Sequence, residues 1–151
     1  MEPQLEERSF HLSSSVELVR VPKDGVSKAW PLAAPLLEKA VNRTEKVTLS
    51  GLRESMISGD MQLWLVYDTA SNSVLAACGT ELATYVSGFK TARLLLLGGL
   101  DLDRWAFFLA NFEKWAKEEG CDAVEMVGRK GWGKMFPDYE PIEHWFAKEI
   151  R

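Results

Sequence analysis

The chain has 151 residues, of which 46% are hydrophobic and 26% charged, and it carries a formal net charge of -4. A chain of this length forms one domain that buries about 70% of the surface exposed by its unfolded form, so its folding requires neither disulfides nor metals. The longest apolar run, 94–100, is too short to span a membrane, and the acidic balance disfavours general nucleic-acid binding.

Residues 1–15 are rich in polar and charged side chains and contain no apolar run of signal-peptide length. We therefore expect a mobile N-terminal tail in front of a single domain, 16–151, and a cytoplasmic protein. Val16–Val21 alternates apolar and polar residues, which predicts a strand with one solvated face.

Two helices are predicted after this strand. Ser27 can cap a helix that continues to Val41, because apolar residues recur along it at helical spacing. Thr48 or Ser50 can cap a second helix, and Gly59 is placed to end it.

The middle of the chain predicts an antiparallel meander. Apolar, β-branched and aromatic residues fill 63–68 and 74–85, and the polar cluster at 69–73 favours a hairpin turn between them. After a second turn near 86–88, the run 90–97 becomes continuously apolar, which is typical of a central strand covered on both faces.

From Asp101 the apolar period changes to three and four residues, which predicts an amphipathic helix that ends at Gly120. Its aromatic side chains are expected in the core at this spacing: Trp105, Phe108, Phe112 and Trp115. A strand follows at 123–127. It must run parallel to the strand at 90–97, because a helix of this length crosses back over the sheet.

A short helical turn at 131–136, a loop and a final strand at 142–150 complete the predicted order. The fold class is α/β of the α+β type: a mixed, mostly antiparallel sheet with helices on both faces. Cys78 and Cys121 lie in separate apolar segments, with no second Cys or His at metal-ligand spacing. We expect two reduced, buried thiols and no metal site.

The segment 91–139 carries the most specific pattern. An apolar strand ends in Gly98 and Gly99 and leads directly into a helix, and the next strand leads into a Gly/Trp-rich turn that ends at Asp138 and Tyr139. With the order of elements from Val16 onward, this pattern resembles the GNAT superfamily of N-acetyltransferases. Proteins of this appearance are frequent among bacteriophage accessory proteins, in which GNAT-like domains are often shortened or altered.

In that superfamily acetyl-CoA lies in a wedge between the fourth and fifth strands, and its pyrophosphate binds backbone amides at a helix N-terminus. The resemblance implies these cofactor contacts: Leu97, Gly98, Gly99, Leu100, Arg104, Gly128 and Arg129. The glycine spacing of the family's loop is absent, however, and Asp101 and Asp103 place carboxylates where phosphates would bind. A strand-to-helix turn with a side-chain cap is therefore the competing interpretation of 98–104.

The chemistry of the family requires a base for the amine and commonly a Tyr that protonates the leaving thiolate. Glu81 lies in an otherwise apolar strand and is the first candidate for the base; an outward-facing strand residue is the competing interpretation. Glu125 has a similar setting and a lower claim. The position of the family's Tyr falls near Lys134 or Phe136, and Tyr139 matches an aromatic that usually packs.

Two functions follow from the resemblance. The first is an acetyl-CoA-dependent N-acyltransferase that acts on a primary amine of a small molecule, nucleotide derivative or protein. The alternative is a non-catalytic GNAT-like interaction or structural domain, for example a phage virion or host-directed accessory protein, located in the host cytoplasm or the virion, with Trp132 filling the wedge. Nucleic-acid binding through Arg129, Lys130 and Lys134 is a third and weaker hypothesis, given the acidic balance.

Overall fold

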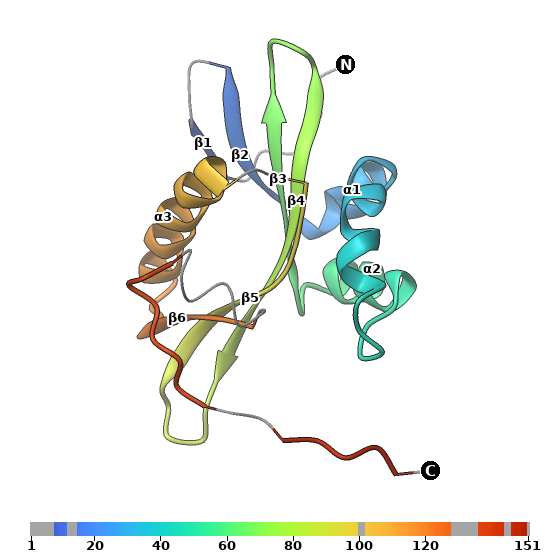
Figure 1. Ribbon diagram of the computed structural model, residues 1–151. Coiled ribbons are helices and arrows are strands. Elements are labelled where there is room, and N and C mark those ends of the chain that lie inside the picture. The colour runs from blue at the N-terminus through green and yellow to red at the C-terminus, as the bar shows by residue number, and fades with distance from the viewer. Residues whose placement is uncertain (1–7, 12–14, 100–101, 128–135, 144–145, 151) are drawn as a thin grey trace.

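The computed structural model describes residues 8–11, 15–99, 102–127, 136–143 and 146–150, with the backbone alone at 8–11, 96–97 and 102–107 (Figure 1). The strands are β1 (Arg8–His11), β2 (Val16–Val21), β3 (Gln62–Asp68), β4 (Ser73–Thr84), β5 (Lys90–Gly98) and β6 (Ala123–Met126). The helices are the single-turn η1 (Lys23–Gly25), α1 (Val26–Val41), α2 (Leu49–Ser58) and α3 (Leu102–Glu118).

The described strands form one sheet in the order β1-β2-β3-β4-β5-β6. Every neighbouring pair is antiparallel except β5 and β6, which run parallel because α3 crosses over the sheet between them. The mixed, mostly antiparallel sheet predicted from the sequence is thus confirmed.

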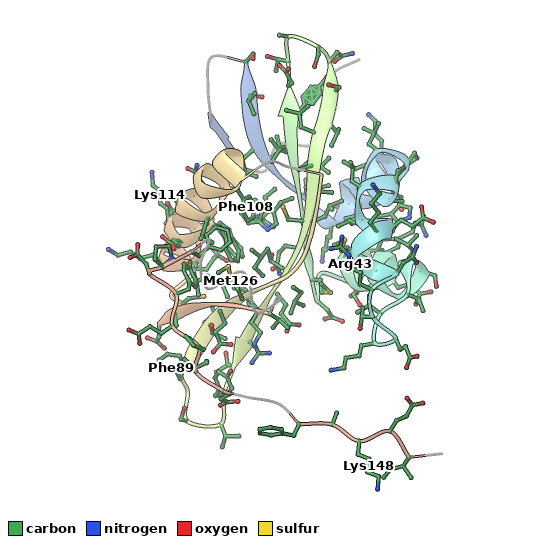
Figure 2. The ribbon with its side chains drawn as sticks, in the orientation of Figure 1. Arg43, Phe89, Phe108, Lys114, Met126 and Lys148 are labelled. Carbon is green, nitrogen blue, oxygen red and sulfur yellow. The ribbon has the colours of Figure 1, made fainter. Side chains whose placement is uncertain are left out.

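Helices cover both faces of the sheet: α1 and α2 lie on one face and α3 on the other (Figure 1). Alternate residues of β2, β3, β4 and β5 supply two separate cores, one on each face. Phe108 of α3 and Met126 of β6 lie between α3 and the sheet, whereas Lys114 points outward (Figure 2). No described helix has the length and apolar content needed to cross a membrane.

Local signals explain the helix ends. The Gly51 amide donates to Thr48 Oγ1 at 3.0 Å at the start of α2, and Gly59 ends that helix with a φ of 89°. Helix α1 starts without a side-chain cap, so the predicted cap at Ser27 is wrong. The Val26 amide donates instead to the carbonyl of Lys23, because η1 leads directly into α1.

Two predictions about the ends of the chain need correction. Arg8–His11 pairs with β2, so this part of the predicted mobile tail, 1–15, belongs to the sheet. The predicted strand at 142–150 is wrong for its described residues, which have no regular structure and lead away from the sheet (Figure 1). A strand is stable only when it pairs with a neighbouring strand, and the described residues of this segment pair with none.

The two cysteines are free thiols. Cys78 is buried in the core beneath α3, as predicted, whereas Cys121 is half-buried. Burial raises the pKa of both thiols. Within the described residues, no three His, Cys, Asp or Glu side chains are grouped so that they could hold a metal ion.

Candidate functional site

The described pairing of β5 with β6 ends where the sequence placed the cofactor wedge. Their parallel pairing runs from Thr91 with Ala123 to Leu94 with Met126, and the Val127 amide donates to the Leu94 carbonyl at 3.1 Å. Strand β5 continues to Gly98, and none of its residues beyond Leu94 has a described partner in β6. We call this end of β5, 95–98, which has no described partner in β6, together with Val127 the strand fork.

A β-bulge in β5 accompanies the fork. Thr80 of β4 pairs with Leu94 of β5, but the preceding residue Gly79 pairs with Leu96, so Leu95 is an extra residue in β5. A bulge bends its strand and increases the local twist. Leu95 immediately follows the last residue of β5 that pairs with β6, so the bulge lies where the described pairing of the two strands ends.

Gly98 and Gly99 are required by packing. A Cβ at Gly98 would lie 1.9 Å from the carbonyl oxygen of Leu36 in α1, and one at Gly99 would lie 2.5 Å from the carbonyl oxygen of Leu75 in β4. Gly99 also has a φ of +103°, which side chains disfavour. This tight packing accounts for both glycines without a ligand, and pyrophosphate binding by their amides stays a prediction.

The other predicted cofactor residues are described in part or not at all. Only the backbone is described for Leu97, at the fork, and for Arg104, in the first turns of α3. The remaining residues of the cofactor and nucleic-acid predictions lie outside the described residues: Leu100, Gly128, Arg129, Lys130, Trp132 and Lys134.

Arg93 joins three strands through a polar network that consists of Glu81, Tyr85, Arg93 and Glu125. Its guanidinium donates from Nε to Glu125 at 2.9 Å, from Nη1 to Glu81 at 3.2 Å and from Nη2 to the Tyr85 hydroxyl at 2.9 Å. Tyr85 in turn donates to the Glu125 carboxylate, with its hydroxyl 3.0 and 3.1 Å from the two oxygens. We call these four residues the Arg93 network.

The Arg93 network lies on the face of the sheet that α1 and α2 partly cover. The strand neighbours of its charged residues pack instead in the core beneath α3: Leu82, Ala92, Leu94, Val124 and Met126. Because side chains alternate between faces, Glu81, Arg93 and Glu125 point to the opposite side. Arg93 and Glu125 pair one residue before the fork opens, so the network lies at its base.

The charges of the network are unequal. Two carboxylates face one guanidinium, which leaves one net negative charge when all three groups are ionised. The hydrogen bonds from Arg93 to Glu125 and to Tyr85 raise the pKa of Arg93, so the guanidinium stays charged. The side chains of Glu81, Arg93 and Glu125 keep 29%, 26% and 16% of their surface exposed, so solvent can reach the network.

Glu81 is therefore half-buried and forms an ion pair with Arg93. Arg93 holds its Oε1, while no described residue bonds its Oε2. The sequence singled out Glu81 and Glu125 separately but missed their connection through Arg93 and Tyr85. No local sequence pattern indicates this connection, because Arg93 and Glu125 are 32 residues apart.

Two described residues, Phe136 and Tyr139, lie near the sequence position expected for the general acid. Neither of them faces the Arg93 network. Phe136 is buried in the core beneath α3 and has no proton to donate. The Tyr139 hydroxyl donates to Glu113 of α3, and burial, with this bond, raises the pKa of Tyr139. Tyr139 packs, as predicted from the sequence.

Solved structures resemble the chain along almost its whole length. An aminoglycoside acetyltransferase from an uncultured soil metagenomic sample, solved with trehalose, is 12% identical with a TM-score of 0.67, covering 93% of this chain and 100% of its own. A GNAT family acetyltransferase from Staphylococcus aureus is 16% identical with a TM-score of 0.61, covering 90% and 99%. A predicted acetyltransferase from Clostridium acetobutylicum, solved with acetyl-CoA, is 9% identical with a TM-score of 0.62, covering 89% and 96%.

No protein-family model and no curated protein sequence matches the chain. At identities this low, the likeness of the solved structures establishes the fold. The chain has the fold of the GNAT acetyltransferases, as the sequence pattern implied. A fold hosts more than one activity, so function has to be argued from the fork and the Arg93 network.

Proposed function

We propose that the chain is an acyl-CoA-dependent N-acyltransferase that transfers an acetyl group from acetyl-CoA to a primary amine. The observation that carries this proposal is the strand fork, where the described pairing of β5 with β6 ends beside the bulge at Leu95. Support comes from the likeness to acetyltransferases over 89–93% of the chain, one of them solved with acetyl-CoA.

The fork offers backbone groups suited to an extended ligand. Beyond Leu94, the edge of β5 that faces away from β4 has no described strand partner, so its free N–H and C=O groups can bond an amide-containing chain as another strand would. In the sequence, Leu97, Gly98, Gly99 and Leu100 connect this edge to the start of α3, whose first turns contain Arg104, and their amides are proposed to bind the pyrophosphate. Gly128 and Arg129, which come after β6 in the sequence, are proposed as further contacts.

Acetyl-CoA, when bound, supplies the acetyl group activated as a thioester. The chain's own contribution is to bind and deprotonate the amine. The net negative Arg93 network attracts an ammonium group, and Arg93 fixes Glu81 through Oε1 while leaving Oε2 to accept its proton. Glu81 is thus proposed as the base.

Calorimetric titration with acetyl-CoA tests the proposal, followed by measurement of CoA release with a panel of primary amines. Saturable binding and amine-dependent release are expected. Glu81→Gln should lower turnover by about 10²-fold or more while the affinity for acetyl-CoA stays unchanged, because the amide cannot take up the proton. Glu54→Gln, an exposed position on α2, is the matched control and should behave as the original chain does. Absence of binding at millimolar acetyl-CoA would contradict the proposal.

Two observations favour a second candidate, a non-catalytic interaction or structural domain such as a phage virion or host-directed accessory protein. Packing alone requires both Gly98 and Gly99, and Arg93 already holds Glu81. This candidate would be found in the host cytoplasm or in the virion, with a protein partner in place of acetyl-CoA. A partner that co-purifies in stoichiometric amount, together with no acetyl-CoA binding, supports it; acetyl transfer to any amine rejects it.

A further inference from the structure

The hairpin between β4 and β5 carries exposed apolar side chains. Tyr85 and Phe89 keep 43% and 44% of their surface exposed, and Val86 is fully exposed. Tyr85 and Phe89 flank the turn, where the Tyr85 amide donates to the Phe89 carbonyl at 2.8 Å, and their ring centroids lie 6.3 Å apart. The hairpin projects beyond the helices on both faces (Figures 1 and 2). We call Tyr85, Val86 and Phe89 the hairpin patch.

The hairpin patch is continuous with the Arg93 network through Tyr85. The Tyr85 hydroxyl bonds to Glu125 and Arg93, whereas its ring pairs with Phe89. The Arg93 guanidinium also lies over the Tyr85 ring, 5.3 Å from its centroid, which holds the ring in place. One tyrosine side chain therefore connects a net negative site with an apolar surface, and the two are no further apart than its own length.

Toward the fork, the same face of the sheet is covered. Leu95 packs against the core beneath α1 and α2, and Gly98 lies so close to the Leu36 carbonyl of α1 that it leaves no room for a Cβ. Along β5 the face thus changes from covered at Leu95, through the partly exposed Arg93, to the exposed Phe89. A ligand that reaches the network on this face has the hairpin patch beside it.

We propose that the Arg93 network and the hairpin patch together bind a primary amine that is joined to an aromatic ring by a short alkyl link. Its ammonium group bonds to Glu81, whose Oε2 no described residue bonds, and its ring packs against Tyr85 and Phe89. Aromatic pairs gain from ring geometry beyond the area that they bury. This inference rests on the proposed function, because it names the class of acceptor for the same site.

The charge balance favours an amine with one cationic centre over a polyamine. Two carboxylates face one guanidinium, so a single ammonium group neutralises the network when all are ionised. The three side chains of the hairpin patch carry no charge. A second cation placed there would lose hydration without gaining a charged partner, whereas an aromatic ring would cover the exposed apolar surface.

Calorimetric titration of the full chain with phenethylamine and with propylamine tests the site without acetyl-CoA. Both amines are cations at neutral pH, and only phenethylamine carries a ring, so it should bind about tenfold more tightly or better. Phe89→Ala should reduce this ratio to about twofold or less, because the ring loses its partner. Leu32→Ala removes an exposed apolar side chain on α1 and is the matched control, which should keep the ratio of the original chain.

Acetyl transfer separates this inference from the proposed function. With acetyl-CoA present, the ring should lower KM rather than raise kcat, because its contacts are made before the reaction begins. Equal affinities for the two amines, no binding of either, or a ratio that survives Phe89→Ala overturns the inference, and acetyl transfer to propylamine would then leave the proposed function standing. Ring-dependent binding of phenethylamine to a chain that does not bind acetyl-CoA supports the amine site and contradicts acyl transfer.

Discussion

Each face of the sheet has an apolar core, but the core beneath α3 and the Arg93 network on the opposite face are built from different interactions. On the α3 face, the Trp64 ring centroid lies 6.0 Å from Phe108, 5.8 Å from Phe112 and 5.1 Å from Trp115, each in an edge-to-face arrangement. Trp64 is fully buried, and its N–H donates to Thr80 Oγ1 at 2.9 Å. On the opposite face, near the fork, the sheet carries the half-exposed, net negative Arg93 network.

This difference separates the residues that stabilise the fold from those that are available for binding or catalysis. Aromatic side chains beneath α3 gain from area burial and from ring geometry, and a close-packed interior tolerates little change. Ion pairs that solvent can reach contribute little to folding, so the Arg93 network can be altered at small cost in stability. We therefore expect substitutions on the α3 face to unfold the protein and those in the network to change what it binds or transfers.

Trp64→Ala should produce the largest effect. Loss of the indole leaves a cavity among three aromatic neighbours and removes the donor to Thr80, so the free energy of unfolding should fall by about 3–5 kcal/mol. Urea unfolding followed by circular dichroism measures it. Phe89→Ala, an aromatic truncation at a residue that is 44% exposed, is the control and should cost less than about 1 kcal/mol. Equal costs at the two sites would show that the buried aromatic cluster around Trp64 contributes no more to stability than an exposed ring.

Gly98→Ala should produce the next largest effect, because it acts where the fork meets α1. The added Cβ would lie 1.9 Å from the Leu36 carbonyl oxygen, so α1 and the end of β5 must move apart. Overpacking of this kind costs about 1–3 kcal/mol. Thermal or urea unfolding measures the loss, and titration with acetyl-CoA shows whether the fork is changed. An unaltered unfolding midpoint would mean that α1 does not constrain the fork.

Arg93→Met should change stability less than either substitution. Its bonds to Glu81 and Glu125 are partly solvated, so we expect a loss of about 1 kcal/mol or less. A double-mutant cycle with Glu125→Gln should give a coupling energy of about 0.5–1 kcal/mol, because the two side chains are in direct contact. Lys28→Met, at an exposed position on α1, is the control for loss of a cation. Additive effects of Arg93→Met and Glu125→Gln would show that the ion pair is not a stabilising unit.

The order of helices and strands could be predicted because it depends on patterns local in the sequence. The alternation in Val16–Val21, the change of period at α3 and the caps at Thr48 and Gly59 each identify an element from its own residues. Strand β1 was missed because its sequence, Arg-Ser-Phe-His, is mostly polar and forms a strand only through pairing with β2. Residues 142–150 show the converse, because their pattern favours a strand and their described residues pair with no strand of the sheet.

The site was less predictable because it depends on register. Consecutive leucines at 94–97 give no sign of which residue bulges, and the bulge at Leu95 arises from how β5 pairs with β4. Glu81 could be selected as a carboxylate in an apolar strand, but its partner Arg93 follows only from that pairing. Gly98 and Gly99 suggested a ligand loop, whereas their close approach to α1 and β4 was visible only in the structure.

Tyr139→Phe should produce the smallest change in stability. It tests how the chain after β6 is held against α3. Burial and the bond to Glu113 raise its pKa above the ordinary value of 10.0, so the folded state keeps the phenolic proton where the unfolded state loses it. A raised pKa contributes stability that is fully present below pH 10 and is lost as the pH rises toward the folded pKa. Urea unfolding at a series of pH values should therefore show a steeper alkaline loss of stability in the original chain than in Tyr139→Phe, which cannot ionise. Parallel curves would mean that the hydroxyl is solvated, and that the chain after β6 is held to α3 by Phe136 alone.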